Sequence, residues 1–155
     1  MSGPAASPPG TVAALQSALA AEEAAVYGYG IVGANLTGSP QAAAKAGWVA
    51  HQTAADALEA MLQSRGAQPT AAAAGYLLPI TVRSDSEAVS LAVILEDRIE
   101  AAYLGLVALN STAIRQFGAL QLRAAALRAA AWRGSTVAFP GLPASALAAP
   151  QRHES

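Results

Sequence analysis

Hydrophobic residues recur every three or four positions in four successive stretches of the chain, with glycine and proline between the stretches. This spacing places apolar side chains on one face of an α-helix. The pattern predicts helices over residues 11–36, 40–65, 84–109 and, from residue 110 or 111, to residue 133. We therefore expect an all-α protein.

The expected helix ends carry recognisable end signals. Thr11 is a candidate N-cap of the first helix. Ser84 and Glu87 form the capping-box pattern at the start of the third helix. Gly66 and Gly134 follow the second and fourth helices, where a left-handed residue often ends a helix.

Three of the four apolar stripes are interrupted by polar residues. The stripes consist of Leu15, Leu19, Glu22, Val26 and Tyr29; of Trp48, His51, Ala55, Leu58 and Leu62; of Val89, Val93, Glu96, Glu100, Tyr103 and Val107; and of Phe117, Leu120, Ala124, Leu127 and Ala131. Burying an unpaired charge costs several kcal/mol. Each acid in a stripe therefore needs a cationic partner, a metal or a proton.

The connections predict how the helices are arranged. The first and third are short, whereas about eighteen residues separate the second helix from the third. One long crossover among short connections is the topology of ferritin-like four-helix bundles. We divide the chain into an N-terminal segment, residues 1–10, the bundle, residues 11–134, and a C-terminal extension, residues 135–155, that docks in part through Ala138 to Pro143.

Composition narrows the function classes. Cysteine is absent, which excludes disulfides, zinc fingers, iron–sulfur ligation and thiol nucleophiles. Nine basic and ten acidic residues, with no basic cluster, argue against nucleic-acid binding. Alanine supplies 42 residues and charged residues only 12 %, so the surface is weakly charged and favours self-association, which we expect to give a homodimer.

The N-terminal residues have no positively charged region followed by an apolar one, so they do not resemble a secretory signal. The alanine-rich stretches are too weakly hydrophobic for membrane spans. From these features we expect a cytoplasmic protein without membrane association.

Several residues have structural interpretations. Asp97 points about 100° away from Glu96 around the helix, which predicts a pair with Arg98 or Arg133 instead of a shared site. Core packing is predicted for four aromatic residues, Tyr27, Tyr29, Trp48 and Tyr103; the alternative is that they line a small cavity or carry electrons near a metal. Close helix packing or a local bend is predicted for Gly28, Gly30 and Gly33.

Beyond these patterns, the chain resembles a known family over nearly its whole length. The resemblance is carried by residues 21–30, by His51, by Leu95, Glu96, Asp97 and Tyr103, and by Trp132 to Gly134 with Phe139 to Leu142. In order and spacing these residues are similar to a family of small bacterial ferritin-like domains of unassigned function. The resemblance implies a ferritin-like fold, and it implies no reaction.

Ferritin-like proteins with two metal ions use one Glu from each of two helices and a Glu-x-x-His pair from each of the other two. The resemblance implies that Glu22 matches the single Glu of the first helix, that His51 matches the histidine of the second, and that Glu96 or Glu100 serves the third. Trp48 stands where the second helix should carry a Glu, and the fourth helix has no Glu-x-x-His. A full six-ligand site is therefore excluded, while a reduced site for Fe or Mn stays open.

The alternative needs no cofactor. Arg128 lies beside the apolar stripe of the fourth helix, in the row Gln121, Ala125, Arg128 and Trp132, and its guanidinium could pair with two carboxylates. Two functions follow. The first is a non-catalytic, self-associating bundle with a buried carboxylate, His and Arg network; the second is a metal-dependent oxidoreductase or metal-handling protein. The sequence identifies no small-molecule ligand.

Overall fold

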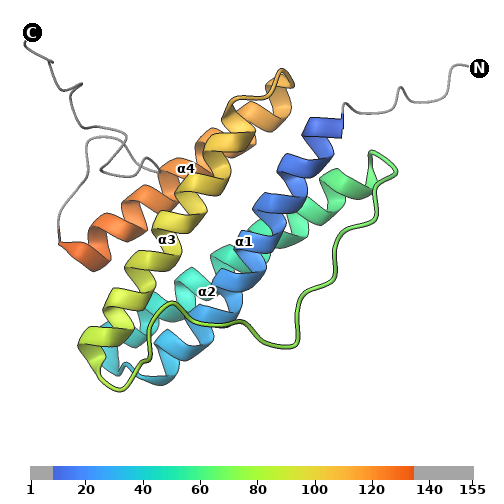
Figure 1. Cartoon of the computed structure of the whole chain (residues 1–155). Coiled ribbons are helices and arrows are strands. Elements are labelled where there is room, and N and C mark those ends of the chain that lie inside the picture. Colours follow the sequence, from blue (N-terminus) through green and yellow to red (C-terminus); the bar gives the residue numbers. More distant parts are fainter. Residues whose placement is uncertain (1–8, 135–155) are drawn as a thin grey trace, which may run out of the picture.

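The computed structural model describes residues 9–134, and this part of the chain folds into four helices with no strand (Figure 1). The helices are α1 (Pro9–Ala34), α2 (Gly38–Gln63), α3 (Asp85–Val107) and α4 (Thr112–Arg133). The predicted all-α four-helix architecture is confirmed. Within residues 9–134, none of the helices combines the length and apolarity needed to cross a bilayer.

The helices form two hairpins, α1 with α2 and α3 with α4, and the hairpins meet mainly through α1 and α3. The connection over residues 64–84 extends from one end of the bundle to the other (Figure 1). As a result α2 and α3 run in the same direction, whereas the two helices of each hairpin are antiparallel. This arrangement brings the middle of all four helices to one level.

Local hydrogen bonds explain most helix ends. Ser84 Oγ accepts from the backbone N–H of Glu87, as predicted, but the Glu87 carboxylate accepts from the N–H of Arg83 instead of completing the capping box at Ser84. Gly134 ends α4 with φ +77°, a left-handed conformation that glycine adopts without a steric penalty. The prediction of Thr11 as an N-cap is wrong, because α1 already begins at Pro9.

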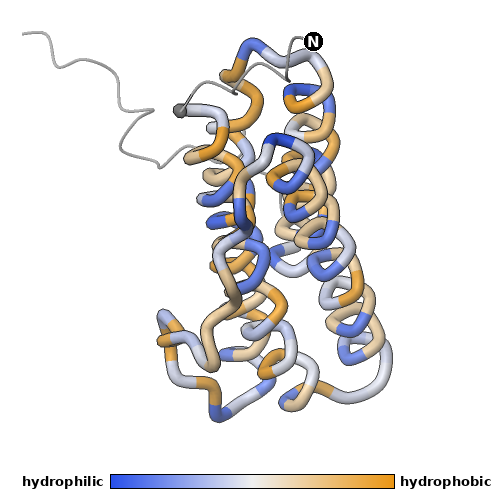
Figure 2. The backbone as a smooth tube through the Cα atoms, turned by 90° about the vertical axis from the view of Figure 1, so that its right-hand side faces the viewer, coloured by the Kyte–Doolittle hydropathy of each residue, from blue (hydrophilic) through white to orange (hydrophobic). Residues whose placement is uncertain are grey.

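The interior contains two apolar clusters, one toward each end of the bundle. The first includes Leu15, Leu19, Leu58, Leu62, Leu106 and Ile114, and the second includes Val32, Leu36, Ala44, Leu91 and Leu95. Figure 2 shows apolar and polar residues alternating along each helix, as expected for helices with one face inside. Glu22, His51 and Glu96 lie near the midpoints of their helices.

The predicted apolar face of α4 is wrong at its two leucines, although its first residue, Phe117, packs against Tyr103 of the core. Leu120 and Leu127 are 64 % and 62 % exposed, and the buried residues of α4 are Ile114, Gly118, Ala125 and Ala129. A Cβ at Gly118 would lie 3.0 Å from the Cβ of Leu106, so small residues let α4 approach α3 closely. The helix therefore buries its small residues and leaves its leucine stripe at the surface.

The prediction that three glycines of α1 allow close helix packing is confirmed at one of them. A Cβ at Gly28 would lie 2.5 Å from Leu95, so this glycine permits close packing of α1 on α3. A Cβ at Gly33 would meet only the Cβ of Ala44, at an ordinary 3.8 Å, and one at Gly30 would meet nothing within 4 Å. Packing therefore explains Gly28 and leaves Gly30 and Gly33 unexplained.

Candidate functional site

A buried polar network lies where the four helices meet, and each helix contributes to it. Its acids are Glu22 of α1 and Glu96 of α3, both at most 1 % exposed. Its cations come from the other helix of each hairpin, His51 of α2 and Arg128 of α4. The sequence had proposed these residues together as a site, and the structure brings them within hydrogen-bonding distance of one another.

His51 bridges the two acids. Its Nδ1 lies 2.6 Å from Oε2 of Glu22, and its Nε2 lies 3.1 Å from Oε1 of Glu96. A neutral imidazole carries one N–H, whereas an imidazolium carries two. Both contacts are hydrogen bonds to carboxylates only when both ring nitrogens are protonated, so this geometry fits the charged form of His51.

One oxygen of Glu96 collects three donors. Oε1 accepts from the hydroxyl of Tyr29 at 2.5 Å and from Nε of Arg128 at 2.7 Å, in addition to the contact with His51. The other oxygen, Oε2, is buried and accepts no hydrogen bond from the described residues. The predicted inward reach of Arg128 is thus present at one carboxylate, but the predicted pairing with two carboxylates is not.

Two tyrosines complete the network in a reciprocal pattern. Tyr103 of α3 donates to Oε1 of Glu22 at 2.6 Å, while Tyr29 of α1 donates to Glu96 of α3. Trp132 in turn donates from Nε1 to the Tyr29 hydroxyl at 2.9 Å. The sequence predicted that the tyrosines pack in the core, with a role near a metal as the alternative, but it did not predict their hydrogen bonds to the acids. The missed signal was a spacing of seven residues between acid and tyrosine in both helices, 22 to 29 and 96 to 103.

The pKa directions agree with ionised partners. Burial by itself would lower the pKa of His51, but the hydrogen bonds and charges of Glu22 and Glu96 outweigh burial and raise it. Burial likewise acts to raise the pKa of Glu96, and His51 with Arg128 lowers it on balance. Burial and the neighbouring Glu22 raise the pKa of Tyr103, so its hydroxyl stays a donor. With both cations and both acids charged, the four groups have no net charge.

This arrangement does not fit the metal site that a ferritin-like fold implies. A metal ligand must offer a lone pair, and both ring nitrogens of His51 face carboxylate oxygens as donors. The guanidinium of Arg128 supplies a fixed positive charge at Glu96, which a metal cation would have to displace. Across residues 9–134, no three acid or histidine side chains stand in a metal-binding arrangement.

The remaining site residues occupy different surroundings. Glu100 is buried one turn beyond Glu96 on α3, at 1 % exposure. Asp97 points away from the network and accepts from Nη2 of Arg133 at 2.7 and 3.0 Å, which confirms the predicted pairing. Tyr27 and Trp48 are 37 % and 36 % exposed, so the prediction that they pack in the core is wrong.

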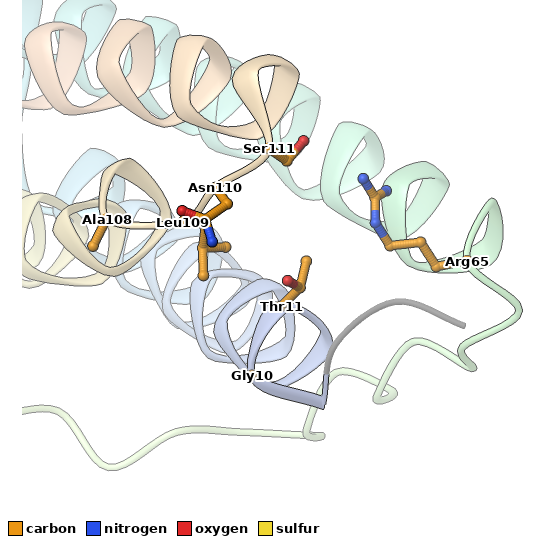
Figure 3. Close-up of a pocket in the computed structure, with 7 residues that line it drawn as sticks. All are labelled: Gly10, Thr11, Arg65, Ala108, Leu109, Asn110 and Ser111. Carbon is orange, nitrogen blue, oxygen red and sulfur yellow. The ribbon is translucent and has the colours of Figure 1, made fainter. Parts of the chain in front are cut away.

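The surface has hollows at the end of the bundle and beside this network. One of about 300 Å³ opens at the end of the bundle where α1 begins and α3 joins α4 (Figure 3). There Thr11, Arg65 and Ser111 come from three parts of the chain, and Arg65 donates from Nη1 to the backbone oxygen of Met61. Another, of about 340 Å³, lies between α1 and α2 and is lined in part by Tyr29 of the network.

Comparison with known proteins gives a family and no activity. No curated protein matches the chain. The chain is similar to a solved structure described as a conserved hypothetical protein, rv2844, from Mycobacterium tuberculosis, at 34 % identity and a TM-score of 0.79. The match covers 83 % of this chain and 98 % of that one. Residues 14–144 match a family described as a domain of unknown function, DUF4439, and the chain belongs to this family.

Proposed function

We propose that this protein is a non-catalytic ferritin-like bundle in which an ion-pair network occupies the position of the metal site. The observation that carries the proposal is the placement of His51 between Glu22 and Glu96, with Arg128 on the same Glu96 oxygen. Two protein cations then neutralise two acids that metal ions would otherwise neutralise. The long connection over residues 64–84 supports the ferritin-like assignment, because this topology places one crossover between the second and third helices.

The network joins the four helices without performing a reaction. Removing one partner from a buried ion pair strongly destabilises a protein, because it leaves an uncompensated charge. A connected network also restricts the helices to one relative arrangement. We infer that Glu22, His51, Glu96 and Arg128 serve to hold the bundle in register.

Self-association is the second part of the proposal. Leu120 and Leu127 lie exposed on α4, and Ala124 and Ala131 continue the same row at the three-and-four spacing of a helix-pairing seam. A seam of this kind is suited to a second copy of the chain, which agrees with the expected homodimer.

Elemental analysis combined with histidine NMR tests the central proposal. We expect protein purified without chelator to contain no stoichiometric Fe, Mn or Zn, and both ring nitrogens of His51 to be protonated at neutral pH. The signals are assigned with His51→Gln, and His153→Gln serves as the matched control for the other histidine. About one metal per chain, lost on Glu22→Ala, together with a neutral His51, would establish the metal-dependent oxidoreductase or metal-handling alternative.

The association state is measured separately, by sedimentation velocity over a range of concentrations. A dimer that dissociates in Leu120→Lys and Leu127→Lys, but persists in Val49→Lys on α2, supports the α4 seam. Val49 is a matched control because it is an exposed apolar residue on another helix, at 48 % exposure. A monomer at every concentration would overturn the self-association part and leave the network proposal standing.

A further inference from the structure

The hollow between α1 and α2 has features that packing does not explain. It is lined by Tyr29, Gly30, Gly33, Gln41, Lys45 and Trp48 and has a volume of about 340 Å³. It lies outside the ion-pair network and shares with it only Tyr29, whose hydroxyl is bound to Glu96. Ligand binding in the hollow can therefore be tested separately from the role of the ion-pair network.

Two glycines leave this space open. A Cβ at Gly30 would meet no atom within 4 Å, and one at Gly33 would make a single ordinary contact. Both sit inside α1, where glycine is less favourable than alanine because it loses more backbone entropy on folding. Gly28, in contrast, is required by its close approach to Leu95. Neither packing nor a turn accounts for Gly30 and Gly33, whereas a ligand that lies against the backbone of α1 would.

The walls define the ligand chemistry. Trp48 is 36 % exposed although it is a large aromatic residue, whereas Tyr29, the other aromatic residue of the lining, is only 1 % exposed. An accessible aromatic side chain favours a flat, apolar ligand. The Tyr29 ring is held from the side of α2, since a Cβ at Gly47 would lie 2.5 Å from it. Tyr29 is therefore packed into the interior, and Trp48 is the aromatic side chain that a ligand can contact.

A single cation completes the hollow. Lys45 is the only lysine in the sequence, and among the described residues it makes no salt bridge. Gln41 donates from Nε2 to the backbone oxygen of Gly33, which leaves its side-chain oxygen as an acceptor. None of the described residues that line the hollow is acidic. An ammonium beside an accessible aromatic side chain is complementary to a negatively charged group on a flat ligand.

We propose that this hollow binds a small planar aromatic carboxylate, with the ring between Trp48 and the glycine backbone of α1 and the carboxylate at Lys45. The proposal goes beyond the network function and does not depend on it. A bundle that binds metal, or one that stays monomeric, would still present the same hollow.

Titration with naphthalene-2-carboxylate, followed by ¹H–¹⁵N NMR of the full chain, tests the proposal. We expect saturable shifts confined to residues of α1 and α2 around the hollow. The uncharged naphthalene-2-carboxamide should bind about fivefold more weakly, because an exposed ion pair contributes at most about 1 kcal/mol. Lys45→Met should lower the affinity for the carboxylate to that for the amide. Arg123→Met, which removes an exposed cation of α4, should leave the affinity unchanged.

A variant that fills the hollow tests the binding site more directly. Gly30→Leu places a side chain in the open space, so it should abolish binding while the thermal midpoint stays equal to or above that of the parent. Ala20→Leu, at an exposed position of the same helix, should bind as the parent does. Shifts without saturation, or equal affinity in the parent and Gly30→Leu, would overturn the proposal. So would equal affinity for acid and amide.

Discussion

The first and fourth helices carry apolar stripes of the same three-and-four spacing, yet they use them in opposite ways. In α1 the stripe points inward, and Leu15, Leu19 and Tyr29 are at most 1 % exposed. In α4 the equivalent stripe points outward, with Leu120 and Leu127 more than half exposed. The periodicity of a helix therefore predicts that one face is apolar, but not that this face is buried in the same chain.

The difference arises from what each helix contributes to the polar network. On α4, Arg128 bonds to Glu96, Trp132 to Tyr29 and Arg133 to Asp97, and these contacts fix the rotation of the helix. The same rotation places Gly118 and Ala125 against α3. On α1 the acid and the tyrosine belong to the apolar stripe itself, so one rotation of the helix turns both the apolar and the network side chains inward. We infer that polar contacts determine the orientation of α4, where burying the leucines and forming the network require different rotations of the helix.

Among the variants that test this comparison, Glu96→Gln should lower the free energy of unfolding most. It removes the charge that binds His51 and Arg128, and it leaves both cations without their shared carboxylate. We expect the free energy of unfolding to fall by about 3–5 kcal/mol. Urea unfolding monitored by circular dichroism measures the change. Asp97→Asn, which affects only an exposed pair, is the control and should cost less than about 1 kcal/mol.

Arg128→Met should have the next largest effect and should act selectively on α4. The variant keeps the apolar part of the side chain and removes its charged hydrogen bond, at an expected cost of about 1.5–3 kcal/mol. If polar contacts hold the rotation of α4, hydrogen exchange should accelerate more in α4 than in α1. Uniform acceleration across all helices would show that the apolar residues orient α4 instead. Arg133→Met is the matched control.

The pH dependence of stability should follow His51. Its folded pKa is raised above the ordinary 6.5, so its stabilising effect is fully present below pH 6.5 and is lost as pH rises through the folded pKa. Glu96 has a lowered pKa, so its effect is present above pH 4.5 and is lost as pH falls through its folded value. We expect stability to decline on both sides of this interval.

Denaturant titrations of the parent, His51→Gln and His153→Gln at several pH values check the assignment. The alkaline decline should disappear in His51→Gln and remain in His153→Gln. An alkaline decline of equal size in all three proteins would mean that the decline does not come from His51.

Gly28→Ala and Gly30→Ala compare a closely packed glycine with an unpacked glycine on the same helix. The first pushes a methyl group into Leu95 and should destabilise by about 1–3 kcal/mol, whereas the second should stabilise by about 0.5–1 kcal/mol. The two thermal midpoints, measured side by side, decide between them. A loss of stability in Gly30→Ala would indicate that α1 needs that glycine for its fold.

Leu120→Lys should have the smallest effect on the fold itself. An exposed substitution usually changes the free energy of unfolding by less than about 0.5 kcal/mol. Leu19→Ala, at the corresponding inward stripe of α1, should cost about 2–5 kcal/mol. Equal losses at the two positions, measured on the monomer, would contradict the outward orientation of α4.

Sequence alone determined the number of helices, their approximate bounds and the polar residues that interrupt their stripes, because helical periodicity and end signals are local properties. It also placed Glu22, His51, Glu96 and Arg128 in one hypothesis, since buried charges require partners. The C-terminal extension, residues 135–155, lies outside the described residues, so its predicted docking stays a prediction.

Only the tertiary structure decided which face of α4 turns inward, and which acid each cation and each tyrosine meets. These outcomes depend on contacts between residues far apart in sequence, such as Tyr103 with Glu22 and Trp132 with Tyr29. The sequence pattern of one helix does not show whether its leucine stripe or its row of small residues with an arginine faces the interior. The answer depends on the neighbouring helix, because a buried carboxylate there requires the arginine row to face inward.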